Sequence, residues 1–141
     1  MDYFKAIQIS AAGMAAEQAR IEAATLNLAN MNSTAGPGTA GYRPVTAVIN
    51  SVPFAHMLSG ATRPLIIPQA ALVPQTAAPP RLVYEPGHPN ADAAGMVSYP
   101  AVDHTQEMFT VMTALRAYEA NLAALQATKT IAAKALEIGG Q

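Results

Sequence analysis

Few residues in this chain of 141 have the types and spacing needed for catalysis or metal binding. There is no cysteine, so thiolate metal sites and disulfides are excluded. The only imidazoles are those of His56, His88 and His104. His88 and Asp92 have the spacing of two ligands on one helical face, but Pro89 excludes a helix between them. We therefore expect no metal site but a polar turn over residues 85–92, in which Asx side chains accept backbone N–H groups.

The serines and glycines also lack the surroundings of a catalytic or phosphate site. No serine stands in a G-x-S-x-G motif. The glycine cluster at residues 36–41 does not open a helix and lacks the Lys-Ser/Thr of a phosphate loop. Charged residues make up 12% of the chain and its net charge is −1, which gives neither clustered titratable groups nor a field for nucleic acid or an acidic membrane. We expect no enzyme, no catalytic residue and no cofactor.

The longest element that the sequence predicts is a helix from Asp103 to Gly140. Asp103 is a suitable N-cap with Gln106 three residues further on, and Gly139-Gly140 suits the other end. The helix would have about 34 residues and a length of roughly 50 Å. Its apolar residues recur in alternating steps of three and four, the spacing of a coiled-coil seam that needs a partner. The seam consists of Met108, Val111, Leu115, Tyr118, Leu122, Leu125, Ala132 and Leu136, interrupted by Lys129.

Residues 3 to about 31 repeat this pattern more weakly and predict a second helix. Gly13 is its one weak helix former, tolerated where close packing needs it. The helix should end near Asn30 to Asn32, before the breaker Gly36-Pro37-Gly38. Its seven-residue seam consists of Phe4, Ile7, Ala11, Met14, Ile21 and Leu28, with Gln18 and Thr25 as polar positions.

Residues 35–102, between the helices, hold all eleven prolines and show no helical period. Short apolar runs predict strands, which the prolines keep short and confine to pairing at edges. These runs are Val45–Ile49, Leu65–Ile67, Arg81–Tyr84 and Met96–Tyr99. The segment Pro68–Pro80 is rich in Pro, Ala and Gln and should be extended, and Pro86-Gly87 suits the middle of a type II turn.

The sequence thus predicts a mainly α fold with a small β-rich insert. The long N- and C-terminal helices would form an antiparallel coiled-coil-like pair. Three parts follow from this reading: an N-terminal helix over residues 1–34, a Pro-rich β or extended insert over 35–102, and a C-terminal helix over 103–141.

The apolar seams leave two functional interpretations open. Such a seam most often joins two helices of one chain, which would give a cytosolic helical-hairpin adaptor or binding module. However, both helices are rich in alanine and sparsely charged all round, as helices packed on several sides are, and a lone two-helix hairpin is marginally stable. This favours a subunit of an assembly. The chain contains no run of 18 apolar residues and does not begin with a basic and then an apolar block, so we expect neither a membrane-spanning helix nor a secretory signal peptide.

Several segments resemble those of a known family. Asn27–Thr34, preceded by Ile9–Met14 and followed by Gly41-Tyr42-Arg43, resembles the N-terminal signature of bacterial flagellar rod and hook proteins. Further segments are similar to a proximal rod subunit of that family. They are Arg81–Asp92, Gly95–Pro100, Arg116–Asn121 and Lys134–Gly139. Between Pro44 and Pro80 the chain departs from the family, which usually carries more charge there.

The resemblance implies a structural subunit of the flagellar basal body, in the proximal rod that spans the periplasm and transmits torque for motility. In this family the terminal helices pack into the inner tube of the rod, and the chain is exported by the flagellar type III apparatus without a cleaved signal peptide. Its partners would be copies of itself, neighbouring rod proteins and the rod-ring adaptor FliE, with no nucleic acid and no direct membrane insertion. Folding would be coupled to assembly.

We expect one set of residues to form the assembly interface. Apolar members would be packed, so that Leu115→Asp or Leu122→Asp would bury a charge and abolish incorporation. The asparagines of the Asn27–Thr34 motif have two interpretations: they cap the helix and form a turn, or their amides contact an adjoining subunit. The set is Ile7, Met14, Ile21, Leu28, Asn27, Asn30, Asn32, Leu115, Tyr118, Asn121, Leu122 and Leu125.

Overall fold

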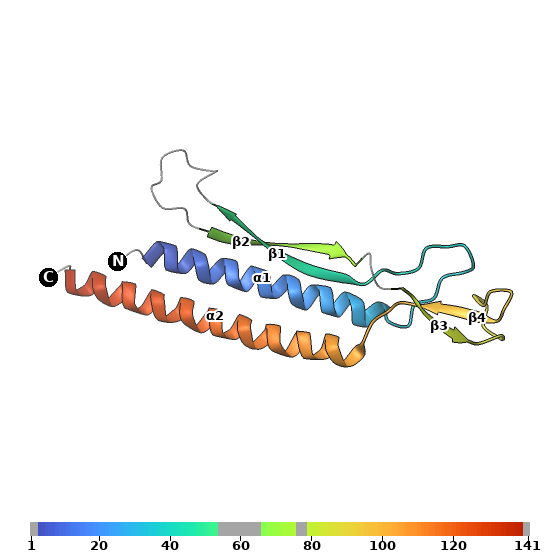
Figure 1. Ribbon diagram of the computed structural model, residues 1–141. Helices are drawn as coiled ribbons and strands as arrows, with labels where there is room; N and C mark the ends of the chain where they lie inside the picture. Colours follow the sequence, from blue (N-terminus) through green and yellow to red (C-terminus); the bar gives the residue numbers. More distant parts are fainter. Residues whose placement is uncertain (1–2, 54–65, 76–78, 140–141) are drawn as a thin grey trace.

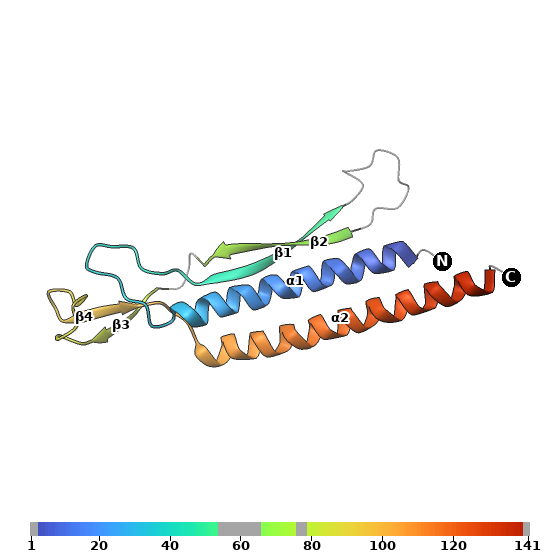
Figure 2. The same cartoon turned by 180° about the vertical axis from the view of Figure 1, so that it is seen from behind.

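The computed structural model describes residues 3–53, 66–75 and 79–139 (Figure 1). Its two long helices are α1, Tyr3–Asn30, and α2, His104–Gly139. They lie side by side and run antiparallel, so that the start of α1 and the end of α2 are at the same end of the molecule (Figure 1, Figure 2). Both predicted helices are therefore present, and two pairs of antiparallel strands lie between them in the sequence.

The predicted cap fixes the start of α2. The Asp103 carboxylate accepts hydrogen bonds from the N–H groups of Thr105, at 2.8 Å, and Gln106, at 3.1 Å. These are two of the N–H groups that a helix leaves unsatisfied at its first turn. The other helix, α1, ends at Asn30, whose main-chain oxygen accepts from the Ser33 N–H at 3.0 Å. Gly140, part of the predicted C-terminal cap, lies outside the described residues.

The strands form two separate antiparallel hairpins. In the first, β1, Val45–Pro53, pairs with β2, Ile66–Pro74. In the second, β3, Arg81–Tyr84, pairs with β4, Met96–Tyr99. The bounds of β3 and β4 are those that the sequence predicted.

Strands β1 and β2 are longer than predicted. β1 continues past Ile49 to Pro53, and β2 runs through Pro68 as far as Pro74, whereas Leu65 lies outside the described residues. The prolines do not break the pairing because each strand has a single neighbour and Pro68 and Pro74 occupy positions whose N–H would point away from it. Hydrogen-bonded and non-bonded pairs alternate along an antiparallel ladder. The Gln75 N–H donates to Pro44 O at 2.7 Å, so the next pair, Val45 and Pro74, is a non-bonded one.

Helix α1 is the middle layer of the molecule. It contacts α2 on one side and the β1–β2 hairpin on the other, while the β3–β4 hairpin lies beyond the end of α1 (Figure 1, Figure 2). Its buried residues are Ala12, Ala16, Ala23, Ala24 and Asn27. Small side chains fill most of these positions because α1 has close neighbours on two sides. Over the part of the chain that is described, neither helix has an apolar stretch long enough to cross a membrane.

Candidate assembly surface and the polar node at the end of α1

The contact between α1 and α2 is built around small side chains and is here called the inner contact. Ala114 of α2 is fully buried. At Gly13 the helices come so close that a Cβ atom would lie 2.9 Å from Nδ2 of Asn121 and 3.0 Å from its Cγ. Real Cβ atoms essentially never approach other atoms so closely, so the position requires glycine unless Asn121 moves. The close approach of the two helices therefore accounts for a glycine at this position.

Many of the large apolar residues of α2 take little part in this contact. Over the first half of the helix they form a row of exposed side chains, here called the outer row. The outer row consists of Met108, Phe109, Met112, Leu115 and Leu122, which are between 37% and 67% exposed. The predicted seam is therefore divided, because Val111, Tyr118 and Leu125 are half-buried while its other members in this region are exposed. Small residues are buried and large apolar ones are exposed, the reverse of a globular core.

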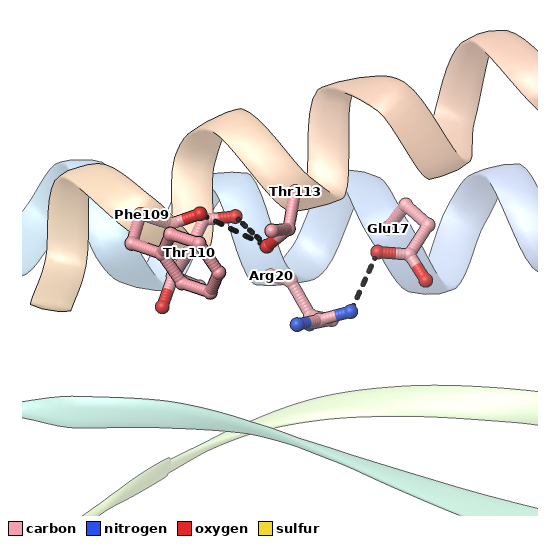
Figure 3. A network of polar contacts seen from close by, with 5 residues as sticks. All are labelled: Glu17, Arg20, Phe109, Thr110 and Thr113. Atoms are coloured by element: carbon pink, nitrogen blue, oxygen red, sulfur yellow. Dashed lines mark hydrogen bonds and ion pairs between the residues drawn. The ribbon is translucent and has the colours of Figure 1, made fainter.

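Threonine side chains beside the outer row are satisfied within their own helix. The Thr113 hydroxyl donates to the main-chain oxygens of Phe109, at 2.9 Å, and Thr110, at 3.0 Å (Figure 3). On α1, Arg20 similarly pairs with Glu17 of its own helix at 3.0 Å (Figure 3). Hydroxyl groups bonded to their own backbone are less available to a polar partner.

The structure places the predicted interface residues in three groups. Asn27 is buried, whereas Asn32, Leu115 and Leu122 are exposed. The half-buried members are Ile7, Met14, Ile21, Leu28, Asn30, Tyr118, Asn121 and Leu125. The exposed leucines are accessible to a second subunit, while Asn27 is enclosed by its own chain.

Asn27 is the centre of a polar node at the end of α1, and it is only 1% exposed. Its Nδ2 donates to the main-chain oxygen of Val45 at 2.8 Å and to Oε1 of Glu107 at 2.9 Å. Its Oδ1 accepts from the Val45 N–H at 2.8 Å and from the Tyr42 hydroxyl at 2.9 Å. A carboxamide has two donor hydrogens and two acceptor lone pairs, so its bonding capacity is used in full.

Glu107 and Tyr42 determine the electrostatics of the node. Glu107 lies in the first turn of α2, where the helix dipole favours a carboxylate. Burial raises the pKa of the Tyr42 hydroxyl above its ordinary value, and the Glu107 carboxylate raises it further. Both effects disfavour the phenolate. Tyr42 therefore keeps the proton that it donates to Asn27.

The asparagines of the motif differ in role. Asn30 follows the local interpretation, because its Nδ2 donates to Leu26 O of the same helix at 2.9 Å and its main-chain oxygen accepts from the Ser33 hydroxyl at 2.8 Å. Asn27 instead joins α1 to β1 and α2 of its own chain. The sequence interpretation missed its partner Glu107, which is 80 residues away and stands in no motif. Tyr42 belongs to the Gly-Tyr-Arg segment of the motif, and that segment was the available signal.

The loop between β3 and β4 is a polar turn, as predicted. Asp92 Oδ1 accepts from the N–H groups of Ala94, at 2.8 Å, and Met96, at 2.9 Å. His88 Nδ1 accepts from the Asn90 N–H at 3.0 Å. These side chains therefore satisfy backbone donors. Of the other two histidines, His104 is exposed and His56 lies outside the described residues.

One detail of this turn differs from the prediction. The His88 N–H donates to Glu85 O at 3.0 Å and closes a turn around Pro86-Gly87. A type II turn requires positive φ at its third residue, but in the described chain positive φ occurs at Gly38 and Gly95 and not at Gly87. The type II assignment is wrong. The left-handed glycine is Gly95 before β4, where a Cβ would lie 2.9 Å from Cε2 of Tyr84.

Comparison with known proteins defines the class of the molecule. A family model described as "Flagellar basal body rod FlgEFG protein C-terminal" matches residues 93–138, which include β4 and nearly all of α2. The two antiparallel helices and this match together indicate a flagellar basal-body rod protein.

Individual relatives cover almost the whole chain. The flagellar basal-body rod protein FlgC of Salmonella typhimurium is 37% identical over 131 residues, which is 93% of each chain. FlgC of Escherichia coli is 38% identical over 133 residues, again 93% of each chain. FlgC of Bacillus subtilis is 33% identical over 149 residues, and the match covers 99% of both chains. The chain therefore belongs to the FlgC family of flagellar basal-body rod proteins.

Proposed function

We propose that this chain is a structural subunit of the proximal rod of the flagellar basal body, where packed subunits transmit torque for motility. The single observation that carries the proposal is the outer row, because large apolar side chains that are exposed along one helix mark a contact with other molecules. The relatives are named as rod proteins, which supports a structural rather than an enzymatic role.

Assembly would couple folding to helix packing. The inner contact is built around small side chains such as Ala114, which contribute little hydrophobic free energy on burial. A large apolar side chain contributes about 1.5–3 kcal/mol when it becomes fully buried. Much of the stabilisation would therefore come from neighbouring subunits that cover Phe109, Met112 and Leu115. In the rod the two terminal helices would form an antiparallel coiled-coil-like pair that carries the insert, which keeps the division into residues 1–34, 35–102 and 103–141.

The partners would be copies of this chain, neighbouring rod proteins and the rod-ring adaptor FliE. The rod would span the periplasm, and the chain would reach it through the type III export apparatus without a cleaved signal peptide. The family relation to basal-body rod proteins supports this location.

Leu115→Asp tests the proposal. Leu115 is 45% exposed, so the substitution should leave the helix content and free energy of unfolding of the isolated protomer nearly unchanged. In a flagellated strain that carries it as the only copy, the charge in a packed contact should abolish incorporation into the rod and swimming. The matched control is Leu115→Met, which conserves apolar character and volume and should support swimming.

Swimming of the Leu115→Asp strain would exclude the outer row as the assembly surface. The alternative of a cytosolic helical-hairpin adaptor would be supported if the tagged wild-type chain stayed in the cytoplasmic fraction and was missing from purified basal bodies. Basal bodies that contain the wild-type chain and lack the Leu115→Asp variant are the expected result.

A further inference from the structure

The two hairpins have strand edges of two kinds, closed and open. Each strand pairs on one side only, so every second residue points its N–H and C=O away from its partner strand. Along β2 these outward positions include Pro68 and Pro74, which have no N–H to donate. Along β4 they begin with Met96, which exchanges hydrogen bonds with Asp92: its N–H donates to Asp92 Oδ1 and its main-chain oxygen accepts from the Asp92 N–H, both at 2.9 Å. The prolines close the edge of β2, and Asp92 closes the start of β4.

The edge of β1 is open in its middle. Its outward positions are those of the non-bonded pairs with β2, which begin with Val45 and recur at every second residue. At Val45 both main-chain groups are bonded to the Asn27 carboxamide, each at 2.8 Å. The next outward residues are Ala47 and Ile49, and no hydrogen bond within the described chain reaches their N–H or C=O groups. β1 also has no charged side chain of the kind that protects an exposed edge.

The edge of β3 has matching free groups. The Glu85 N–H donates to Gly95 O at 2.8 Å, so the pair next to Tyr84 and Met96 is a bonded one. Alternation then turns the main-chain groups of Leu82 and Tyr84 outward. In the part of the chain that is described, these groups have no hydrogen-bond partner either. The Leu82 and Tyr84 residues are 59% and 67% exposed, so this edge is accessible.

We propose that β3 of one copy of this chain pairs with the edge of β1 of a second copy. Both edges offer two outward residues at a spacing of two. An antiparallel alignment of Ala47 with Tyr84 and of Ile49 with Leu82 forms two bonded pairs, each with both of its N–H···O bonds. Backbone pairing of this kind is how extended segments bind an exposed sheet edge. The occupant is a second copy because this chain itself carries the complementary open edge, in a separate sheet.

The pairing joins two different surfaces and is therefore heterologous. Each copy that receives a strand at β1 still offers its own β3, so the contact repeats along a ring or a helical assembly. Pairing of β1 with β1 would instead close a dimer. The choice of the repeating contact rests on the proposed function, because a rod is built by repetition.

A disulfide between two copies tests the pairing. In the proposed alignment Val48 lies opposite Val83 in a non-bonded pair, where Cα atoms approach to about 4.5 Å and a disulfide can form. The chain contains no cysteine, so Val48→Cys and Val83→Cys each introduce a single thiol. Basal bodies are purified from a flagellated strain that expresses both variants as its only copies, then oxidised and analysed by mass spectrometry. The expected result is a disulfide that joins position 48 of one copy to position 83 of another.

Each variant expressed alone is the control and should give no disulfide-linked dimer. A dimer from Val48→Cys alone would show that β1 meets β1 and would overturn the proposal. Basal bodies that contain both variants without the mixed disulfide would also overturn it, but the proposed function would stand because the chain would be in the rod. Absence of the wild-type chain from basal bodies would instead remove the proposed function.

Two proline substitutions test the edge independently. Ala47 and Ala70 are half-buried alanines at outward positions, one on the edge of β1 and the other on the edge of β2. Neither N–H bonds within the hairpin, so proline leaves the β1–β2 hydrogen bonds in place at both positions. Ala47→Pro removes a donor and places its ring against the incoming strand, so it should abolish incorporation and swimming. Ala70→Pro is the matched control and should preserve both.

The proline pair also decides the outcome if the cysteine variants do not enter basal bodies. Loss of incorporation with Ala47→Pro alone then supports the pairing of β1 with β3. Any other pattern, including equal effects of Ala47→Pro and Ala70→Pro, overturns it.

Discussion

Toward α1, helix α2 presents small side chains, with Ala114 fully buried and Asn121 lying against Gly13. In contrast, the large residues Phe109 and Leu115 of the same helix are 67% and 45% exposed. In most soluble domains the large apolar side chains would fill the inner side and the small ones would be scattered. Here the contact between the two helices uses small residues and leaves large apolar ones exposed.

The difference has an energetic consequence. Hydrophobic stabilisation is roughly proportional to apolar area, about 25 cal/mol per Å², so a contact of alanines contributes much less than a contact of leucine and phenylalanine. Small residues allow a close approach of the helices, which improves packing but supplies little burial. The contact between α1 and α2 therefore contributes little hydrophobic stabilisation, and under the proposed function the outer row would supply more on assembly.

The largest expected effect comes from placing a large residue on the inner side. Ala114→Leu adds volume at a fully buried position. Overpacking should lower the free energy of unfolding of the protomer by about 3 kcal/mol, the upper end of the usual range, because the helices cannot separate without losing their other contacts. Urea unfolding followed by circular dichroism measures the change.

The adjacent residue supplies the control for this substitution. Leu115→Ala, one position along the helix, should change the stability of the protomer little because Leu115 is 45% exposed. If Ala114→Leu and Leu115→Ala were equally harmless in the protomer, the two sides of α2 would not differ as described.

Gly13→Ala gives a smaller effect and a sharper reading of the inner contact. Its Cβ would lie 2.9 Å from Nδ2 of Asn121, so the amide must move and the variant should lose about 1 kcal/mol. In an Asn121→Ala background the obstacle is gone. The same substitution should then stabilise the protomer by up to about 1 kcal/mol through its better helix propensity. If Gly13→Ala changed the free energy of unfolding with the same sign in both backgrounds, Gly13 and Asn121 would not be in contact.

Local patterns in the sequence were enough to predict the elements. Asp103 as a cap, the helix end at Asn30, and the bounds of β3 and β4 follow from capping, breaker and strand signals that act over a few residues. The extension of β2 to Pro74 could not be predicted in the same way. Whether proline ends a strand depends on which side its missing N–H would face, and the pairing register decides that.

The candidate sites divide in the same way, into features that local patterns predict and features that depend on contacts between distant segments. The spacing of three and four identified the helical face that contains Leu115 and Tyr118, yet it could not tell which members turn toward α1. The close pair Gly13 and Asn121 depends on how the two helices are aligned along each other, which no local signal fixes. For Asn27, one interpretation was a local helix cap and turn, and the other was a contact with an adjoining subunit. Its partner Glu107 instead lies 80 residues away in the same chain.

The smallest expected effect concerns the polar node at the end of α1. There, polar side chains instead of small apolar ones make the contact between α1 and α2. Tyr42→Phe removes the hydroxyl that donates to Asn27 and should cost about 0.5–1 kcal/mol at neutral pH. The pKa of Tyr42 in the folded chain is raised above its ordinary value of 10.0, first by burial and then by Glu107. A raised pKa means that the contribution is fully present below about pH 10 and is lost as pH rises through the folded value.

The stability difference between wild type and Tyr42→Phe should therefore shrink as pH rises above about 10, in urea unfolding measured at several pH values. Tyr99, whose pKa is also raised by burial and by its hydrogen bond to Glu85, is present in both proteins, and its contribution cancels in the difference. A difference that stays constant through this range would mean that the Tyr42 proton does not hold the node. The polar node would then depend on Asn27, Val45 and Glu107 alone, the groups that join α1 directly to β1 and α2.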